Sequence, residues 1–176
     1  MSQPVLDVDD YVLRPWRPAD APAVVAAYRD PEIRQWHIHS MNENEALAWI
    51  EAWPKRWRQE RGCGWAAACD DRVLGQISLR TVDLDEGVAE ISYWVLPAAR
   101  GHRIAQRSLT ALTAWSFDVL GVHRIEILHS TRNPASCRVA ERAGYLAEGV
   151  KRSEALHADG WHDMHLHARI ATDYSG

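Results

Sequence analysis

A basic turn follows an apolar stretch near the middle of the chain, in the segment YWVLPAARGHRIAQRSL (residues 93–109). Arg100 and Arg103 flank Gly101 and His102 in this turn. A strand that enters a helix through such a turn exposes the first N–H groups of the helix, which form an anion site with the positive end of the helix dipole. Arg100 and His102 could add side-chain contacts to a phosphate. A solvated basic helix start is the alternative, although cations are unfavourable there unless an anion is bound.

A second segment with several helix signals, NPASCRVAERAGY, covers residues 133–145 and follows the strand-like sequence HRIEILHS. Asn133 can cap the helix, Pro134 fits the first helical position, and Gly144 can end it. Ser136 falls in the first turn, where a serine often does no more than satisfy local backbone donors.

The composition is that of a globular domain with an acidic balance. The 176 residues are 47% hydrophobic and 25% charged, with a net charge of −4 and a pI near 6.1. A chain of this length can bury roughly 70% of its unfolded surface, so it needs neither a disulfide nor a metal to hold a core. Proteins that bind nucleic acid present a strongly basic face, so nucleic acid is not expected as the main partner.

The cysteines and the first residues of the chain indicate the expected cellular compartment. Cys63, Cys69 and Cys137 are odd in number and form no C-x-x-C pair, which is typical of reduced thiols. The opening residues MSQPVLDVDD lack the features of a signal peptide, and no apolar run reaches the roughly 18 residues of a membrane span. We therefore expect a cytoplasmic protein with no membrane partner.

Periodicity in the first half of the chain predicts a strand, helices and then a meander. The strand covers residues 11–13, and Asp20 is the expected N-cap of the helix that follows it. A second helical pattern reaches about Glu60, with a break or kink at Pro54. From Trp65 the period is two, which predicts three antiparallel strands joined by tight turns.

The second half of the chain continues with helices that alternate with strands. An apolar stripe of Ile104, Leu112, Trp115 and Val119 predicts a helix that ends at Gly121. The helix after Asn133 precedes two strands around the Asp159-Gly160 turn. The element order βα(α)βββαβαββ predicts a single α+β domain whose central mixed, mostly antiparallel sheet is flanked by helices.

The sequences AEISYWVLPAARGHRIAQRSL and NPASCRVAERAGY together resemble the GNAT superfamily of acyl-CoA-dependent N-acyltransferases. The pyrophosphate loop of that family reads Gln/Arg-x-x-Gly-x-Gly/Ala. Arg100 and Ala105 match this pattern, and Arg103 stands at the position of the first glycine. The resemblance covers about residues 10–170 and includes the order of the elements.

A finer resemblance concerns the second segment. Asn133 and Ser136 form N-x-x-S, and Ala140 stands where common GNAT enzymes carry a tyrosine. This pattern resembles the ribosomal-protein alanine N-acetyltransferase (Rim-type) branch, which modifies α-amines and also small amines. The resemblance implies one acyl-CoA N-acyltransferase domain over residues 1–176, with acetyl-CoA as co-substrate, an amine acceptor and a possible homodimer.

The resemblance also implies a binding path for acetyl-CoA. The pantetheine arm would lie along the strand that ends near Val95, and a backbone N–H of this stretch would polarise the thioester carbonyl. The pyrophosphate would rest on the basic turn. The residues expected to bind the cofactor are Trp94, Val95, Leu96, Arg100, Gly101, His102, Arg103, Ile104, Ala105, Asn133 and Ser136.

Two residues are predicted to be catalytic. Glu90 shares a strand face with Ser92 and Trp94 and could deprotonate the acceptor ammonium through a water. An exposed glutamate paired to a neighbouring strand is the alternative. Under the family reading Ser136 would stabilise the leaving thiolate, with Tyr145 as a second candidate for the acid, although an aromatic at that position more often packs.

The arginine in the glycine position of the loop raises a conformational question. If residue 103 needs a positive φ, arginine has a steric cost that glycine avoids. If it is right-handed, the N–H donors are intact and the guanidinium can add a phosphate contact. We expect the second case.

Histidines gather near the C-terminus, and tryptophans gather between residues 36 and 57. His165 and His167 point the same way on a strand, as two metal ligands do, but no cysteine lies close in sequence. We therefore expect solvent-facing histidines and no metal.

Of the clustered tryptophans, Trp36 is a candidate to bind the amine acceptor, together with Tyr93.

The expected function is transfer of an acetyl group from acetyl-CoA to a primary amine, on a peptide, protein or small molecule. The transfer is expected to be direct, within a ternary complex, because Cys137 has no evident histidine partner. The alternative is a non-catalytic acyl-CoA-binding or interaction module on the same fold. A module that only binds would not need Glu90 or Ser136.

Overall fold

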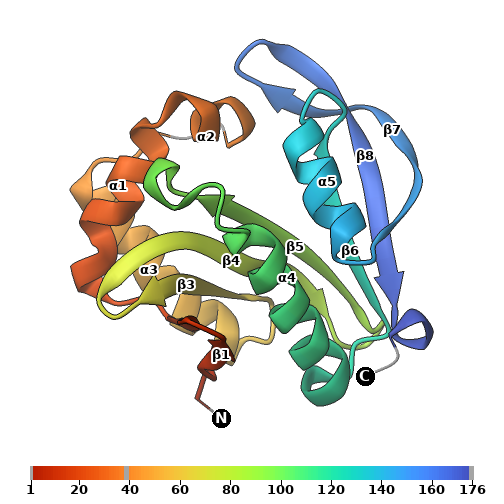
Figure 1. The fold of residues 1–176 in the computed structure, drawn as a ribbon, viewed down its shortest axis with the longest axis horizontal. Helices are drawn as coiled ribbons and strands as arrows, with labels where there is room; N and C mark the ends of the chain where they lie inside the picture. Colours follow the sequence, from red (N-terminus) through yellow and green to blue (C-terminus); the bar gives the residue numbers. More distant parts are fainter. Residues whose placement is uncertain (1, 38–39, 175–176) are drawn as a thin grey trace.

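The computed structural model describes residues 2–37 and 40–174, which fold around one sheet of eight strands (Figure 1). The strands are β1 (Leu6–Val8), β2 (Tyr11–Pro15), β3 (Cys63–Cys69), β4 (Arg72–Asp83), β5 (Val88–Val95), β6 (Arg124–Ser130), β7 (Leu146–His157) and β8 (Gly160–Ile170). The helices are α1 (Ala21–Arg29), α2 (Pro31–Trp36), α3 (Glu43–Arg58), α4 (Ile104–Trp115) and α5 (Pro134–Arg142). The strand order is β1-β2-β3-β4-β5-β6-β8-β7.

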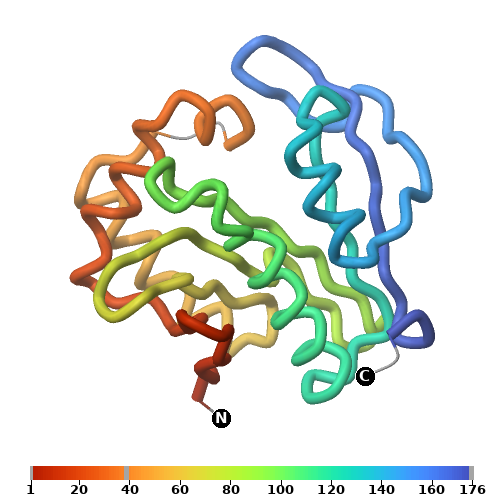
Figure 2. Tube along the Cα trace, viewed as in Figure 1, coloured from red at the N-terminus to blue at the C-terminus, as the bar shows by residue number. Residues whose placement is uncertain are grey.

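The sheet consists of two antiparallel halves that meet at a parallel pair, β5 and β6. Their register covers only three residue pairs, from Val88–Arg124 to Glu90–Glu126. Beyond Glu90 the two strands are no longer paired, and the arm that contains β4 and β5 diverges from the arm that contains β6 and β8 (Figure 2). The split therefore opens along residues 91–95 of β5.

Helices cover both faces of the sheet and enclose two apolar cores. α1 and α3 pack on one face, where Val24, Ile50 and Trp94 are buried. α4 and α5 pack on the other face, where Ile91, Leu112 and Ala140 are buried (Figure 1). Ile91 and Trp94 lie in different cores because successive residues of a strand point to opposite faces.

The prediction of an α+β domain with a mixed, mostly antiparallel sheet is confirmed. The sequence analysis missed β1 and the separate short helix α2. It correctly predicted the capped start of α5 and its end, because Asn133 accepts a hydrogen bond from Ser136 N and Gly144 has a φ of 81°. No helix in the described part of the chain is long and apolar enough to cross a membrane.

Of the break or kink predicted at Pro54, the break does not occur, because α3 runs from Glu43 to Arg58 with this proline inside it. Proline removes one backbone hydrogen bond from a helix interior. The helix continues because Ala46, Ile50 and Trp53 bury its apolar face against the neighbouring elements. Tertiary packing of an amphipathic face outweighs the local cost.

The predicted cap at Asp20 is also wrong for α1. Its carboxylate makes no cap hydrogen bond there, and instead holds the Arg14 guanidinium through two contacts of 2.7 and 2.9 Å. It also accepts from Arg17 N, at the start of a short 3-10 turn. A buried arginine needs this paired partner more than the helix start needs a cap.

The helical segment that begins with α4 ends at Gly121, as predicted, although α4 itself stops at Trp115 and Val119 does not belong to its buried stripe. Residues Ser116–Leu120 form a π-helical turn, and Gly121 follows with a φ of 76°. The wider turn changes the periodicity. Val119 therefore points outward and is 66% exposed.

Candidate active site

A cavity of about 740 Å³ fills the split between β5 and β6. Its walls come from both arms of the sheet, from the turn before α4, and from the first turns of α5. We call the end of the cavity that lies away from the parallel pair the wide end. There α2 and the hairpin of β7 and β8 reach toward one another (Figure 1), and His157 Nδ1 lies 3.2 Å from the carbonyl of Gln35. The cavity therefore lies between the two arms of the sheet.

The turn before α4 forms one end of this cavity. Gly101, Arg103, Ile104 and Ala105 line it. Within the described chain, the backbone N–H groups from residue 101 to residue 106 have no acceptor, and the first N–H of this helix that is paired is that of Arg107. A run of free N–H groups at the positive end of a 12-residue helix is suited to bind an anion.

The expectation of a right-handed Arg103 is wrong. This residue has a φ of 57° and a ψ of 24°, in the left-handed region, and it immediately precedes the first helical residue of α4. A left-handed L-residue costs roughly 1–2 kcal/mol. Glycine adopts this conformation without such a cost, so the arginine at this position carries backbone strain.

Arg100 and His102, the side chains predicted to contact a phosphate, each have a partner within the protein. Arg100 forms ion pairs of 2.8 Å with both Asp30 and Glu32. His102 is exposed, lies 3.1 Å from the Arg100 carbonyl through Nδ1, and is not among the residues that line the cavity. A bound anion would compete with two carboxylates for Arg100.

The backbone of β5 offers free groups to the cavity in an alternating pattern. Leu96 donates its N–H to the Leu74 carbonyl over 2.9 Å. The antiparallel ladder then directs the groups of Trp94 toward β4 and those of Tyr93 and Val95 toward the split. Of the three residues predicted to hold the pantetheine arm, Val95 has backbone groups on the cavity side.

Ser136 and Asn133 lie on the opposite wall, at the start of α5. The Asn133 side chain caps the helix by accepting from Ser136 N over 3.1 Å. The Ser136 hydroxyl makes no hydrogen bond to any described residue, so it can donate to a ligand. The side-chain oxygen of Asn133 therefore serves the helix cap that the sequence predicted.

Tyr93 bridges the two walls. Its hydroxyl donates to the carbonyl of Ser136 over 3.3 Å, and its ring lines the cavity. Burial raises the pKa of Tyr93 to about 12, so the phenol is neutral near pH 7. The sequence predicted Tyr93 only as a residue that binds the amine acceptor. Its contact with Ser136 could not be predicted, because only the tertiary structure brings β5 close to α5.

Glu90 lies at the point where the parallel pairing of β5 and β6 ends. Its carboxylate is 3.3 Å from the Arg80 guanidinium, and its side chain is 20% exposed. Arg80 and Ser92 line the cavity, whereas Glu90 is not among the lining residues. The carboxylate is therefore separated from the cavity by its neighbours and could exchange protons with it only through water.

Tyr145 is not placed to act as an acid in this cavity. The residue is 2% exposed, and its hydroxyl lies 2.6 Å from Thr113 Oγ1 in the core under α4. Burial raises the pKa of its phenol. Tyr145 does not line the cavity, so it is the packing aromatic that its position after Gly144 suggested.

Aromatic side chains form the wide end of the cavity, as the tryptophan cluster suggested. Trp36, Trp49 and Trp53 line it, and the Trp36 ring lies edge-on to the ring of His157 at 6.1 Å. Trp57 instead packs against Trp115 in the core on the α4 face.

The expectation of solvent-facing histidines near the C-terminus is wrong. His157, His162 and His167 are buried, at 7%, 1% and 1% exposure. Cys137 also has a histidine neighbour, since its Sγ lies 3.7 Å from His167 Nε2. These contacts join α2, α5 and β8, which no local sequence pattern could bring together.

The sequence between residues 10 and 146 matches the acetyltransferase (GNAT) domain. The chain is 27% identical over 153 residues to the uncharacterized N-acetyltransferase YoaA of Bacillus subtilis (strain 168), covering 85% of this chain and 86% of that protein. It is 33% identical over 102 residues to the ribosomal-protein-serine acetyltransferase of Escherichia coli (strain K12), covering 57% and 56%. Its fold matches that of RimL, a ribosomal L7/L12 alpha-N-protein acetyltransferase in complex with coenzyme A, with a TM-score of 0.88, 20% identity, and 95% and 98% coverage.

The split sheet, with free N–H groups at the helix start beside it, defines the fold class of the N-acetyltransferases. The chain belongs to the GNAT acetyltransferase family. The predicted resemblance to a Rim-type branch is confirmed by relatives that are named ribosomal-protein acetyltransferases.

Proposed function

We propose that this protein transfers an acetyl group from acetyl-CoA to the primary amine of a peptide, protein or small molecule, in a direct reaction within a ternary complex. The observation that carries the proposal is the continuous cavity, which joins the free N–H groups before α4 to the hydroxyls of Tyr93 and Ser136. The donor occupies the α4 side of the split, and the acceptor enters from the wide end beside Trp36.

The N–H groups between Gly101 and Gln106 bind the pyrophosphate of acetyl-CoA, because they have no competing acceptor and lie at the positive end of the α4 dipole. The left-handed Arg103 lies within this run of N–H groups. Arg100 contributes after its guanidinium exchanges one of its carboxylate partners for phosphate. The pantetheine arm then follows the free backbone groups of Tyr93 and Val95.

In the reaction the amine nitrogen attacks the thioester carbonyl, so a C–N bond forms and the C–S bond breaks. Glu90 accepts the proton that the amine loses, through water that enters beside Arg80. The Ser136 hydroxyl donates a hydrogen bond to the departing thiolate. Tyr93, a neutral phenol, holds the Ser136 carbonyl and so positions the first turn of α5.

One observation favours the alternative of a non-catalytic acyl-CoA-binding module. Arg100 is engaged by two carboxylates, and Arg103 is strained, so the loop binds the donor less tightly than a glycine loop with a free arginine would. A module that only binds the donor has no use for a free hydroxyl at the cavity wall or for a carboxylate that reaches the cavity through water.

The test measures release of CoA thiol from acetyl-CoA with peptides that begin with serine or alanine and with small primary amines. We expect acceptor-dependent thiol release in the wild type, and a loss of about 10² or more in kcat for Glu90→Gln. A matched control is Glu86→Gln, which changes an exposed glutamate in the turn between β4 and β5 and should keep full turnover. Donor binding without turnover for every acceptor, or full activity of Glu90→Gln, would overturn the proposed chemistry.

A further inference from the structure

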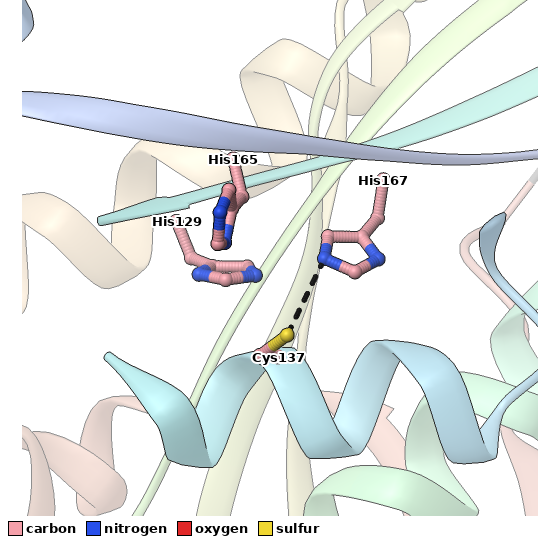
Figure 3. Close-up of side chains that lie close together, drawn as sticks. All are labelled: His129, Cys137, His165 and His167. Atoms are coloured by element: carbon pink, nitrogen blue, oxygen red, sulfur yellow. Dashed lines mark hydrogen bonds between the residues drawn. The ribbon is translucent and has the colours of Figure 1, made fainter. Parts of the chain in front are cut away.

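Four side chains that bind transition metals in proteins lie together beside the cavity: His129 on β6, His165 and His167 on β8, and Cys137 on α5 (Figure 3). We call them the histidine–cysteine cluster. The antiparallel register places His129 directly opposite His165, and His167 lies two residues further along β8 on the same face. α5 packs on this face, and Cys137 projects from it toward the three rings (Figure 3).

The spacing of the cluster is close to that of a tetrahedral site. One potential ligand atom from each residue lies within 4.8 Å of every other. Zinc–nitrogen and zinc–sulfur bonds of about 2.0–2.3 Å require ligand atoms about 3.3–3.6 Å apart. Cys137 Sγ and His167 Nε2 are already 3.7 Å apart, so small side-chain rotations would complete the arrangement.

The hydrogen bonds in the cluster leave ring nitrogens available for a ligand. His129 Nδ1 lies 2.9 Å from the carbonyl of Ser130, to which it donates as N–H, and this fixes Nε2 as the unprotonated nitrogen. His129 Nε2 and His165 Nδ1 are buried without a hydrogen-bond partner in the described chain. A carbonyl that holds the other ring nitrogen is the usual support of a metal-binding histidine.

The charges also suit a cation. The Cys137 thiol donates to the carboxylate of Glu141 over 3.5 Å, so a negative charge lies directly beside the cluster. Metal binding would release the thiol proton to solvent and leave Glu141 beside the complex as a compensating charge.

Packing alone accounts poorly for this arrangement. Buried polar atoms in native proteins are almost always hydrogen-bonded, and one left without a partner costs about 1–3 kcal/mol. Here three buried ring nitrogens, His129 Nε2, His165 Nδ1 and His167 Nδ1, lack partners in the described chain and lie near one thiol. A bound ion would satisfy the first two at once.

We propose that the histidine–cysteine cluster binds one transition-metal ion of the Zn²⁺ class, with three imidazoles and one thiolate as its ligands. Imidazole and thiolate ligands select zinc, cobalt or copper over magnesium and calcium, which need oxygen ligands. Four protein ligands close the coordination sphere, so the role is structural. The ion clamps α5 to β6 and β8 directly beside Ser136, and His129 brings it to the wall of the cavity.

The test uses tag-free, full-length protein that has been stripped of metal with a chelator and is titrated with Co²⁺ in a reducing buffer. We expect binding at one ion per chain, with visible bands of tetrahedral cobalt and a near-ultraviolet thiolate-to-cobalt band, both displaced by Zn²⁺. Cys137→Ser should abolish the thiolate band, and His165→Ala should weaken binding by more than about 100-fold. Matched controls are Cys69→Ser and His123→Ala, which lie outside the cluster and should bind as the wild type does.

Thermal unfolding provides a second readout and shows whether each variant is folded. Zn²⁺ at a hundredfold excess over its Kd should raise the Tm of the wild type by about 5–10 °C and leave that of Cys137→Ser unchanged. Absence of stoichiometric binding by the folded wild type, or an unchanged thiolate band in Cys137→Ser, would overturn the proposal. Because neither acetyl-CoA nor an amine is present, failure here is separate from failure of the acetyl transfer.

Discussion

At the scale of single residues, the hydroxyl of Ser136 is the group best placed to meet the departing sulfur. It stands at the start of α5, lines the cavity and has no other partner among the described residues. We predict that Ser136→Ala lowers kcat by about 10², because one hydrogen-bond donor to developing charge is lost. The Kd for acetyl-CoA should stay nearly constant.

Steady-state kinetics and calorimetry check this prediction together. Thr131→Ala removes an exposed hydroxyl from the loop that precedes the same helix and serves as the control. A loss of donor affinity with an unchanged kcat would show that Ser136 only binds the cofactor.

Arg103 supports a second prediction at this scale, since its backbone is left-handed. Arg103→Gly and Arg103→Ala both remove the guanidinium, but only the glycine variant relieves the strain. We predict that the glycine variant is more stable than the alanine variant by about 1 kcal/mol, measured by urea unfolding. Equal stabilities of the two variants would contradict the left-handed conformation.

Any loss of acetyl-CoA affinity that the two Arg103 variants share measures the contribution of the side chain to phosphate binding. A gain that appears only with glycine measures the flexibility of the loop. Arg103→Gly and Arg103→Ala together therefore separate the contribution of the guanidinium from the effect of loop flexibility.

At the scale of elements, the hydroxyl pair between Thr113 and Tyr145 ties α4 to the start of β7. We predict that Tyr145→Phe lowers the free energy of unfolding by about 1–2 kcal/mol, because it leaves the buried Thr113 hydroxyl without its partner. The kcat of the folded protein should remain within about twofold of the wild type. A large loss of kcat with unchanged stability would restore Tyr145 as the catalytic acid.

The elements that the sequence predicted best are those with local signals. The cap at Asn133, the hairpin turn beside Gly160 and the end of the helical segment at Gly121 all depend on residues that are close together in the chain. No break forms at Pro54 and the Asp20 side chain does not cap α1, because a packed helix face and a buried arginine outweigh the local preference.

The site divides in the same way between local and tertiary features. The loop before α4 and the first turn of α5 were visible in the sequence, because each combines a glycine or a cap with its neighbours. The engagement of Arg100 by Asp30 and Glu32, and the approach of Tyr93 to Ser136, join segments that are far apart in the chain. The register of β6 against β8, which gathers the histidine–cysteine cluster, is equally invisible to a local pattern.

At the scale of the whole molecule, the two arms of the sheet are joined across the wide end by His157, whose Nδ1 donates to the Gln35 carbonyl. Burial, the largest effect, and the charges of His162 and Arg132 lower its pKa, while the Gln35 carbonyl and Asp159 oppose them. The folded protein therefore binds fewer protons at His157 than the unfolded chain does.

We predict that stability is full above the ordinary histidine pKa of about 6.5 and falls as the pH drops below it toward the depressed value of the folded state. Urea unfolding at several pH values between 5 and 8 measures the slope of the unfolding free energy against pH. His157→Gln should flatten it, and the exposed His123→Gln should not. An unchanged slope in His157→Gln would show that another group controls the pH dependence.

The central claim is that the free N–H groups before α4 bind the pyrophosphate of acetyl-CoA. Hydrogen–deuterium exchange of the intact protein, with and without saturating acetyl-CoA, tests it most directly. The account predicts binding in the micromolar range, about −8 kcal/mol, with slowed exchange at the amides of residues 101–106. Absence of binding, or binding that leaves exchange at these amides unchanged, would contradict the claim.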